Sequence, residues 1–161
     1  MDLIPLIIVA AISGGTTLLF AVLGGILNEK AGIINLGTEG IMLVGAVMAA
    51  IMFIQTQNLF LTLVVTVVAS GILGLVHAFL CITLRTNQIV SGLAITLFGS
   101  GFSAYIGKSV AGMPIPVNIP TLDITFINSI PYIGPIFSGL NVFILCSIVL
   151  SILLYVYMYK T

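Results

Sequence analysis

The sequence predicts an all-α, polytopic membrane protein with about five transmembrane helices, one of which is short or broken near residues 28–40. Three observations support this prediction. Of 161 residues, 60% are hydrophobic and only 5% are charged, whereas ordinary soluble domains carry about 25% charged residues. Several apolar runs reach the roughly 20 residues that cross a bilayer as a helix. Three of the few charged residues gather between Asn28 and Glu39, beside a run that is too short.

The first predicted span is Leu3 to Leu27. Its apolar part is too long for a cleaved signal peptide, and Asp2 stands where such a signal would carry lysine or arginine. We therefore expect a helix that is retained in the membrane.

The second span is the short one. Its apolar run, Ile41 to Ile54, covers about 21 Å at 1.5 Å per residue, whereas the hydrocarbon core is about 30 Å thick. We therefore expect the helix to begin earlier, near Ile33 to Leu36, or the segment to be re-entrant. Either alternative draws Asn35 and Glu39 into or just beneath the membrane surface.

Glu39 is the acidic residue that this arrangement has to accommodate. The helix dipole favours a carboxylate near a helix N-terminus, but one at the bilayer centre costs about 2.5–3.5 kcal/mol. We expect Glu39 to face the protein interior or a wet cavity. Gly32, Gly37 and Gly40 would let the backbone bend or another helix approach. An ordinary glycine-rich loop is the alternative.

Three further spans are predicted, at Leu59 to Leu84, Ile89 to Gly107 and Asn141 to Tyr159. The connection before the last one, residues 108–140, contains five of the six prolines. Because it is too apolar for a solvated linker, we expect a partly ordered cap on the outer surface. Residues 1–161 are interpreted as a single transmembrane domain.

Each polar side chain inside the predicted spans could serve either in packing or in function. His77 is a lone ionisable residue within the third span, and we favour a neutral packing histidine over a proton relay. The fourth span contains several hydroxyls, at Ser91, Thr96, Ser100 and Ser103. They either return hydrogen bonds to their own backbone or line a path for a neutral polar solute, and both alternatives stay open.

The two cysteines, Cys81 and Cys146, lie within apolar runs. We interpret them as buried small hydrophobes and not as a disulfide or metal pair. Small residues also recur four positions apart, as at Gly45 and Ala49, a spacing that packs membrane helices closely.

The distribution of basic residues predicts the orientation in the membrane. With five spans, Lys30, Arg85 and Lys160 fall on one side and only Lys108 falls on the other. Cytoplasmic loops are enriched in lysine and arginine. We therefore expect an outer N-terminus and a cytoplasmic C-terminus.

Several function classes find no support in the sequence. The net charge is zero, so there is no basic surface for nucleic acid. The phosphate-binding GxxxxGK[ST], HExxH and GxSxG motifs are missing, and the chain has only four acidic residues. We expect no enzymatic activity in the chain itself, and neither a cofactor nor a metal.

Two sequence blocks resemble permease subunits of ABC importers, in the group that handles branched-chain amino acids, ribose and nucleosides. The first block fits the motif G-x-x-N-[LI]-G-x-E-G-x-M-L-x-G-A, at Gly32, Asn35, Leu36, Gly37, Glu39, Gly40, Met42, Leu43, Gly45 and Ala46. The second fits Q-x-V-S-G, at Gln88, Val90, Ser91 and Gly92. The loop "IPVNIPTLDI" resembles the nucleoside branch, which works with basic-membrane-protein lipoproteins.

The resemblance implies a permease component of an ATP-driven importer for nucleosides or a related small polar solute, located in the cell membrane. Its implied partners are a second permease subunit, a cytoplasmic ABC ATPase and an extracytoplasmic substrate-binding lipoprotein. Carried over residue by residue, Asn35, Glu39, Gln88 and Ser91 become candidates for lining or gating the path. The implied bending or packing glycines are Gly32, Gly37, Gly40, Gly45 and Gly92. A packing role for the four lining candidates is the alternative.

Members of the resembled family are longer than this chain and continue into a cytoplasmic loop that docks on the ATPase. We therefore expect these residues to correspond to the N-terminal half of a full permease. Two alternatives of other classes remain: a small self-contained channel or secondary carrier, and a non-transporting membrane assembly subunit.

Overall fold

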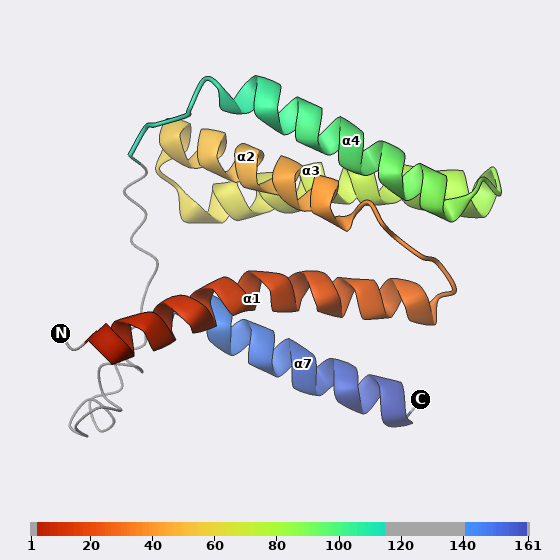
Figure 1. Cartoon of the computed structure of the whole chain (residues 1–161), viewed down its shortest axis with the longest axis horizontal. Helices are drawn as coiled ribbons and strands as arrows, with labels where there is room; N and C mark the ends of the chain where they lie inside the picture. The colour runs from red at the N-terminus through yellow and green to blue at the C-terminus, as the bar shows by residue number, and fades with distance from the viewer. Residues whose placement is uncertain (1–2, 115–140, 161) are drawn as a thin grey trace. The chain divides into compact units, whose positions relative to one another are not determined.

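The computed structural model describes residues 3–114 and 141–160, and their regular structure is helical (Figure 1). The α-helices are α1 (Leu3–Lys30), α2 (Thr38–Thr56), α3 (Leu59–Ala78), α4 (Gln88–Gly107) and α7 (Val142–Lys160), and a π-helical turn, η1 (Phe79–Thr83), follows α3. Within the described residues, five helices are long and apolar enough to cross a membrane. The predicted all-α membrane fold is therefore confirmed.

The chain divides into two compact units. One comprises residues 1–24 and 117–161, and the other comprises residues 25–116. Among the described residues, the first unit holds most of α1 together with α7. The second holds the end of α1 and the elements α2, α3, η1 and α4. The prediction of a single domain over residues 1–161 stays a prediction.

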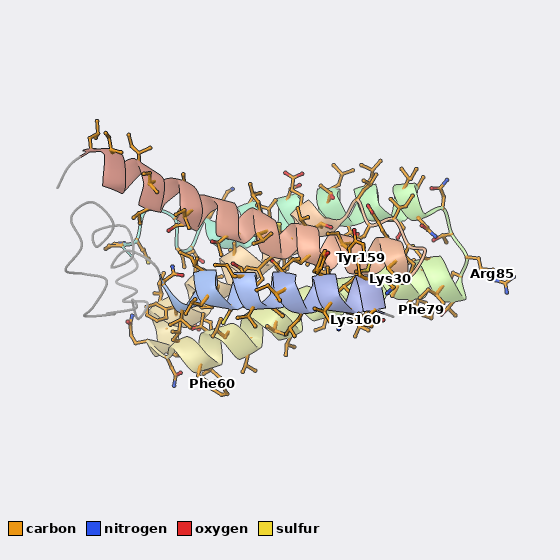
Figure 2. The ribbon with its side chains drawn as sticks, turned by 90° about the horizontal axis from the view of Figure 1, so that it is seen from below. Lys30, Phe60, Phe79, Arg85, Tyr159 and Lys160 are labelled. Atoms are coloured by element: carbon orange, nitrogen blue, oxygen red, sulfur yellow. The ribbon has the colours of Figure 1, made fainter. Side chains whose placement is uncertain are left out.

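In the second unit α2 packs against both α3 and α4, as Figure 1 shows. The buried apolar side chains of this unit are Val44, Val47, Phe53, Cys81 and Ile95. Many large apolar side chains point outward instead. Figure 2 shows this for Phe60 and Phe79, which are 76% and 54% exposed. Such a surface suits hydrocarbon, because lipid tails are as apolar as the side chains that face them.

Asparagine side chains begin two of the helices at the polar breaks in the sequence. Asn58 precedes α3, and its side chain accepts a hydrogen bond from the Leu61 N–H at 3.1 Å. Asn87 precedes α4 and accepts from the N–H groups of Ile89 and Val90. Both satisfy backbone donors that have no partner within their own helix.

The start of α2 differs from the prediction. The expected start near Ile33 to Leu36 is wrong, because the helix begins at Thr38 and residues 31–37 are not helical. The 19 residues of α2 cover about 28 Å, since the helix extends beyond the apolar run at both ends. A helix of that length already approaches the thickness of the hydrocarbon core, so an earlier start is not required.

In the first unit, hydroxyl groups bond to their own helices. Thr16 donates to the Ile12 carbonyl at 2.8 Å in α1, and Ser147 donates to the Ile144 carbonyl at 2.7 Å in α7. In these two residues the hydroxyl hydrogen has its partner within the same helix.

The predicted burial of the two cysteines is right for Cys81 and wrong for Cys146. Both thiols are free, but only Cys81 is buried, and Cys146 is exposed. The buried residues of α7 are Ile144 and Ser147, one turn apart on the same helix face, and Cys146 lies off that face. In a membrane an exposed thiol can face lipid as a small apolar group.

The proline-rich connection falls largely outside the described residues. Residues 108–114 continue from α4 in turns and irregular backbone. The expected outer cap covers residues 115–140, which lie outside the part of the chain that the structure describes.

Candidate functional site

A non-helical segment, residues 31–37, separates α1 from α2 and is the centre of the candidate site. Gly32 ends α1 with a left-handed φ of 78°, a conformation that only glycine adopts without strain. Its N–H donates to the Glu29 carbonyl, and the Ile33 N–H donates to the Asn28 carbonyl, both at 2.9 Å. These bonds satisfy carbonyls at the end of α1, in the manner of a glycine C-cap. The chain therefore turns at Gly32 as it leaves α1.

Asn35 shapes the other end of the non-helical segment. Its Oδ1 accepts a hydrogen bond from the Gly37 N–H at 2.8 Å, and its carbonyl accepts from the Thr38 hydroxyl at 3.1 Å. Gly37 stands at the N-cap position of α2, where it has no side chain to cap the helix. The Asn35 side chain thus forms a local turn that leads into α2.

The backbone of the segment is bonded to side chains of α4. Gln88 accepts from the Ile34 N–H through Oε1 at 2.7 Å and donates from Nε2 to the Gly32 carbonyl at 3.3 Å. Thr96 donates its hydroxyl hydrogen to the Leu36 carbonyl at 2.8 Å. Non-helical backbone at membrane depth is tolerated only where such partners or water are at hand.

A glycine of α4 allows the segment to approach this closely. A Cβ added at Gly92 would lie 2.8 Å from the Leu36 nitrogen and 3.0 Å from the Gly37 nitrogen. Any larger residue at this position would push the segment off α4. Gly37 in turn faces Ile95, whose Cγ2 would lie 3.0 Å from its added Cβ.

The first turn of α2 crosses α4 at two further glycines. An added Cβ at Gly40 would lie 2.5 Å from the Ile95 carbonyl oxygen and 2.6 Å from the Thr96 Cα. On the facing helix, an added Cβ at Gly99 would collide with the backbone of Gly40. The two backbones therefore touch without intervening side chains, which is the contact that small residues permit between membrane helices.

Gly45 forms the corresponding contact between α2 and α3. A Cβ there would lie 2.7 Å from the Ser70 hydroxyl oxygen and 3.5 Å from the Thr66 Cγ2. The other small-residue positions four apart do not all make such contacts: around Gly74 nothing lies within 4 Å of an added Cβ.

Glu39 is the second residue of α2 and its side chain is exposed. Its helix begins beside Ile95, seven residues after the start of α4, or about 10 Å along that helix. The carboxylate therefore lies in the first turn of α2, where the helix dipole favours a negative charge, and well inside the length of α4.

A buried polar cluster joins α3, η1 and α4. His77 is 2% exposed and its Nδ1 lies 3.1 Å from the Oγ of Ser91, which is 6% exposed. The Sγ of Cys81 lies 3.8 Å and 3.7 Å from the two ring nitrogens of His77. Because these distances are nearly equal, the sulfur packs against the ring as a whole. This arrangement agrees with the packing role predicted for His77.

The four lining candidates thus gather around the start of α2. Asn35 and Gln88 bond to the backbone of the non-helical segment, and Ser91 bonds to His77 of α3. Glu39 is exposed. A lining or gating role for the four stays a prediction.

Sequence reasoning missed two contributors. Thr96 was noted only among the hydroxyls of its span, and Gly99 was not singled out. Gly99 lies seven residues after Gly92, two helical turns along the same face of α4. That spacing was the available signal.

Comparison with known proteins gives a consistent result. The family profile described as "Branched-chain amino acid transport system / permease component" matches residues 7–161. A putative glucose ABC transporter permease protein of Haloferax volcanii is 41% identical over 110 residues, which are 65% of this chain and 33% of that protein. The guanosine ABC transporter permease protein NupQ of Bacillus subtilis is 30% identical over 147 residues, 85% of this chain and 46% of its own length.

The nucleoside ABC transporter permease protein NupC of Lactococcus lactis is 28% identical over 158 residues, 91% of this chain and 49% of that protein. The chain therefore spans between one third and one half of the length of these relatives. No solved structure gives a significant match.

Proposed function

We propose that this chain, which belongs to the family of permease components of branched-chain amino acid transport systems, forms part of the translocation path of an ATP-driven importer. The relatives that it matches are permease subunits and not enzymes. ATP hydrolysis is accordingly assigned to a separate ABC ATPase subunit. The chain itself is a multi-pass membrane protein.

The observation that carries the proposal is the position of Glu39. Its side chain is exposed on the chain, yet it lies about 10 Å along α4 from Gln88. A carboxylate facing lipid at such a depth carries a substantial free-energy cost. Water in a path, or a polar surface of a second permease subunit, removes that cost. The exposed carboxylate therefore favours a wet, protein-lined surface at the start of α2.

The proposed solute is a nucleoside or a related small polar molecule. Two of the relatives are named for guanosine and nucleosides and one for glucose. All of these solutes carry several hydroxyl groups and no net charge. Their desolvation requires polar partners along the path, and the exposed Glu39 carboxylate offers such a group.

The proposed orientation places the non-helical segment on the cytoplasmic side. Gln88 contacts Gly32, so Lys30 and Arg85, which lie close to these two residues in sequence, share one end of the second unit. Figure 2 shows Arg85 reaching outward between η1 and α4. Basic residues favour the cytoplasmic side. An extracytoplasmic substrate-binding lipoprotein would then deliver solute at the opposite end.

The test is transport by the complete system. The complete permease, its ATPase and its binding protein are reconstituted in vesicles, and uptake of labelled guanosine, glucose and leucine is measured with and without ATP. We expect ATP-dependent uptake of labelled guanosine, and we expect unlabelled guanosine or adenosine to inhibit that uptake by competition. Uptake of leucine alone would contradict the proposed solute class. Uptake that proceeds without ATP and without an ATPase would favour a secondary carrier and overturn the proposal.

A further inference from the structure

The contacts between the non-helical segment and α4 advance along both elements in the same direction. Gln88 bonds to the segment at Gly32 and Ile34, and Thr96 bonds to it at Leu36. Eight residues of α4 cover about 12 Å. Over that length the bonded residues of the segment advance from Gly32 and Ile34 to Leu36. The two contacts therefore hold the segment along α4 in one register.

The bonding pattern of Gln88 is that of a neighbouring β-strand. In a parallel ladder, one residue of the partner strand donates to the carbonyl before a given residue and accepts from the N–H after it. Gln88 does this with its side chain: Nε2 donates to the Gly32 carbonyl and Oε1 accepts from the Ile34 N–H, one on each side of Ile33. The side-chain amide of Gln88 thus makes the two hydrogen bonds that a neighbouring parallel strand would make.

We propose that Gln88, assisted by Thr96, is the positioning residue that docks the non-helical segment on α4 and so fixes the start of α2 and the place of Glu39. The hydrogen bonds of Gln88 and Thr96 determine the conformation of residues 31–37. This docking role rests on the proposed function, because Gln88 would set the position of Glu39. The first measurement that tests the docking does not require transport.

Only a side-chain amide of this length meets the requirement. A glutamate keeps the acceptor for Ile34 but has no donor, and it places a carboxylate oxygen near the Gly32 carbonyl. A methionine has similar length and neither strong group. An asparagine is one methylene shorter, so its amide would lie farther from the two backbone atoms that Gln88 bonds.

The glutamate variant separates docking from helix stability. Gln88 is the first residue of α4, a position where the helix dipole favours a negative charge. If Gln88 served only as the first residue of α4, Gln88→Glu would leave the stability of α4 unchanged or raise it. If it docks the segment, Gln88→Glu loosens residues 31–37.

The experiment is amide hydrogen exchange, followed by mass spectrometry, on the complete permease in lipid nanodiscs. We expect Gln88→Glu and Gln88→Met to speed exchange in peptides covering residues 31–37 by about tenfold, as the loss of a hydrogen bond predicts. The matched control is Gln55→Met, since Gln55 is exposed near the far end of α2. Its exchange in residues 31–37 should equal that of the unchanged protein.

Exchange as slow in Gln88→Glu as in the unchanged protein would overturn the inference. If neither Gln88 variant accumulates in the membrane, Thr96→Val tests the same docking from its other contact, because it removes only the hydroxyl that bonds Leu36. If amide exchange in residues 31–37 were then unchanged in Thr96→Val, the proposed docking would be overturned. Faster exchange in a protein that still transports normally would support the docking and contradict the path role of Glu39.

Discussion

At the residue scale, the site is built from side chains that satisfy backbone groups. Asn35, Gln88 and Thr96 each bond to main-chain atoms of residues 32–37. In lipid an unsatisfied backbone group costs several kcal/mol, so these bonds stabilise the chain where it leaves the helix. Glu39 is different, because its exposed side chain is not needed to satisfy that backbone.

Neutralising Glu39 should impair transport without affecting insertion. We expect Glu39→Gln in the complete transporter to lower the rate of ATP-dependent uptake about tenfold, the size associated with losing a hydrogen bond to a charged group. The measurement is uptake at matched expression in the membrane. Glu29→Gln is the control, because Glu29 is also exposed and lies in the last turn of α1. Equal uptake by the two variants would argue against a role of Glu39 in the path.

Removing the Ser91 hydroxyl should destabilise the fold. Ser91→Ala leaves the buried Nδ1 of His77 without its partner at 3.1 Å, and we expect a loss of about 1–3 kcal/mol in the free energy of unfolding. Thermal unfolding in nanodiscs measures it. Ser100→Ala serves for comparison, since that exposed hydroxyl bonds only to the Leu97 carbonyl of its own helix. A melting temperature for Ser91→Ala as high as that of Ser100→Ala would contradict the account.

At the element scale, the contact between α2 and α4 depends on glycines that admit no Cβ. Gly92, Gly40 and Gly99 lie against backbone atoms of the opposite element. The helices therefore cross backbone to backbone, and the position of α2 on α4 is fixed within narrow limits.

Adding one methyl group at this crossing should separate the helices. We expect Gly40→Ala and Gly99→Ala each to lower the free energy of unfolding by about 1–3 kcal/mol through overpacking. Gly71→Ala is the matched control, because nothing lies within 4 Å of a Cβ added there and alanine is the better helix former. Thermal unfolding of the three variants decides: a melting temperature for Gly40→Ala at or above that of Gly71→Ala would show that the crossing is looser than described.

Helices whose signal lies within one contiguous stretch of sequence could be predicted, whereas features that depend on contacts with distant residues could not. Long apolar runs predicted all five spans, and the shortness of the run at Ile41 to Ile54 predicted a break before α2. The predicted start near Ile33 was wrong because α2 gains its length by extending beyond the apolar run at both ends. The non-helical backbone before it is bonded by Gln88 and Thr96 of α4, which are distant in sequence. The π-helical turn at Phe79–Thr83 carries no period that distinguishes it from α-helix in so short a stretch.

At the scale of the whole molecule, the family match over residues 7–161 agrees with the function inferred from two sequence blocks. The motif of the first block could be recognised because its residues lie together in the chain. The pairing of that block with Gln88 and Gly92 could not be read from spacing, since the partners are separated by more than fifty residues in sequence. The exposure of Cys146 was equally hidden, because it depends on which face of α7 is covered.

The orientation of the molecule is open to direct measurement. We expect Thr86→Cys, in the loop before α4, to react with an impermeant thiol reagent only from the cytoplasm. We expect Ser109→Cys, just after α4, to react only from outside. Both residues are exposed, and labelling of intact cells against inverted vesicles distinguishes the two sides. The reverse pattern would contradict the proposed N-terminus outside.

The most direct test of the central claim is the water accessibility of position 39. Glu39→Cys is placed in a complete permease that carries Cys81→Ser and Cys146→Ser, and it is labelled with a charged, water-soluble thiol reagent. We predict rapid labelling that guanosine slows, whereas Leu75→Cys, at a 71% exposed apolar position of α3, reacts only with a lipid-soluble reagent. If position 39 also reacted only with the lipid-soluble reagent, Glu39 would face lipid and the proposed path would not exist at this place.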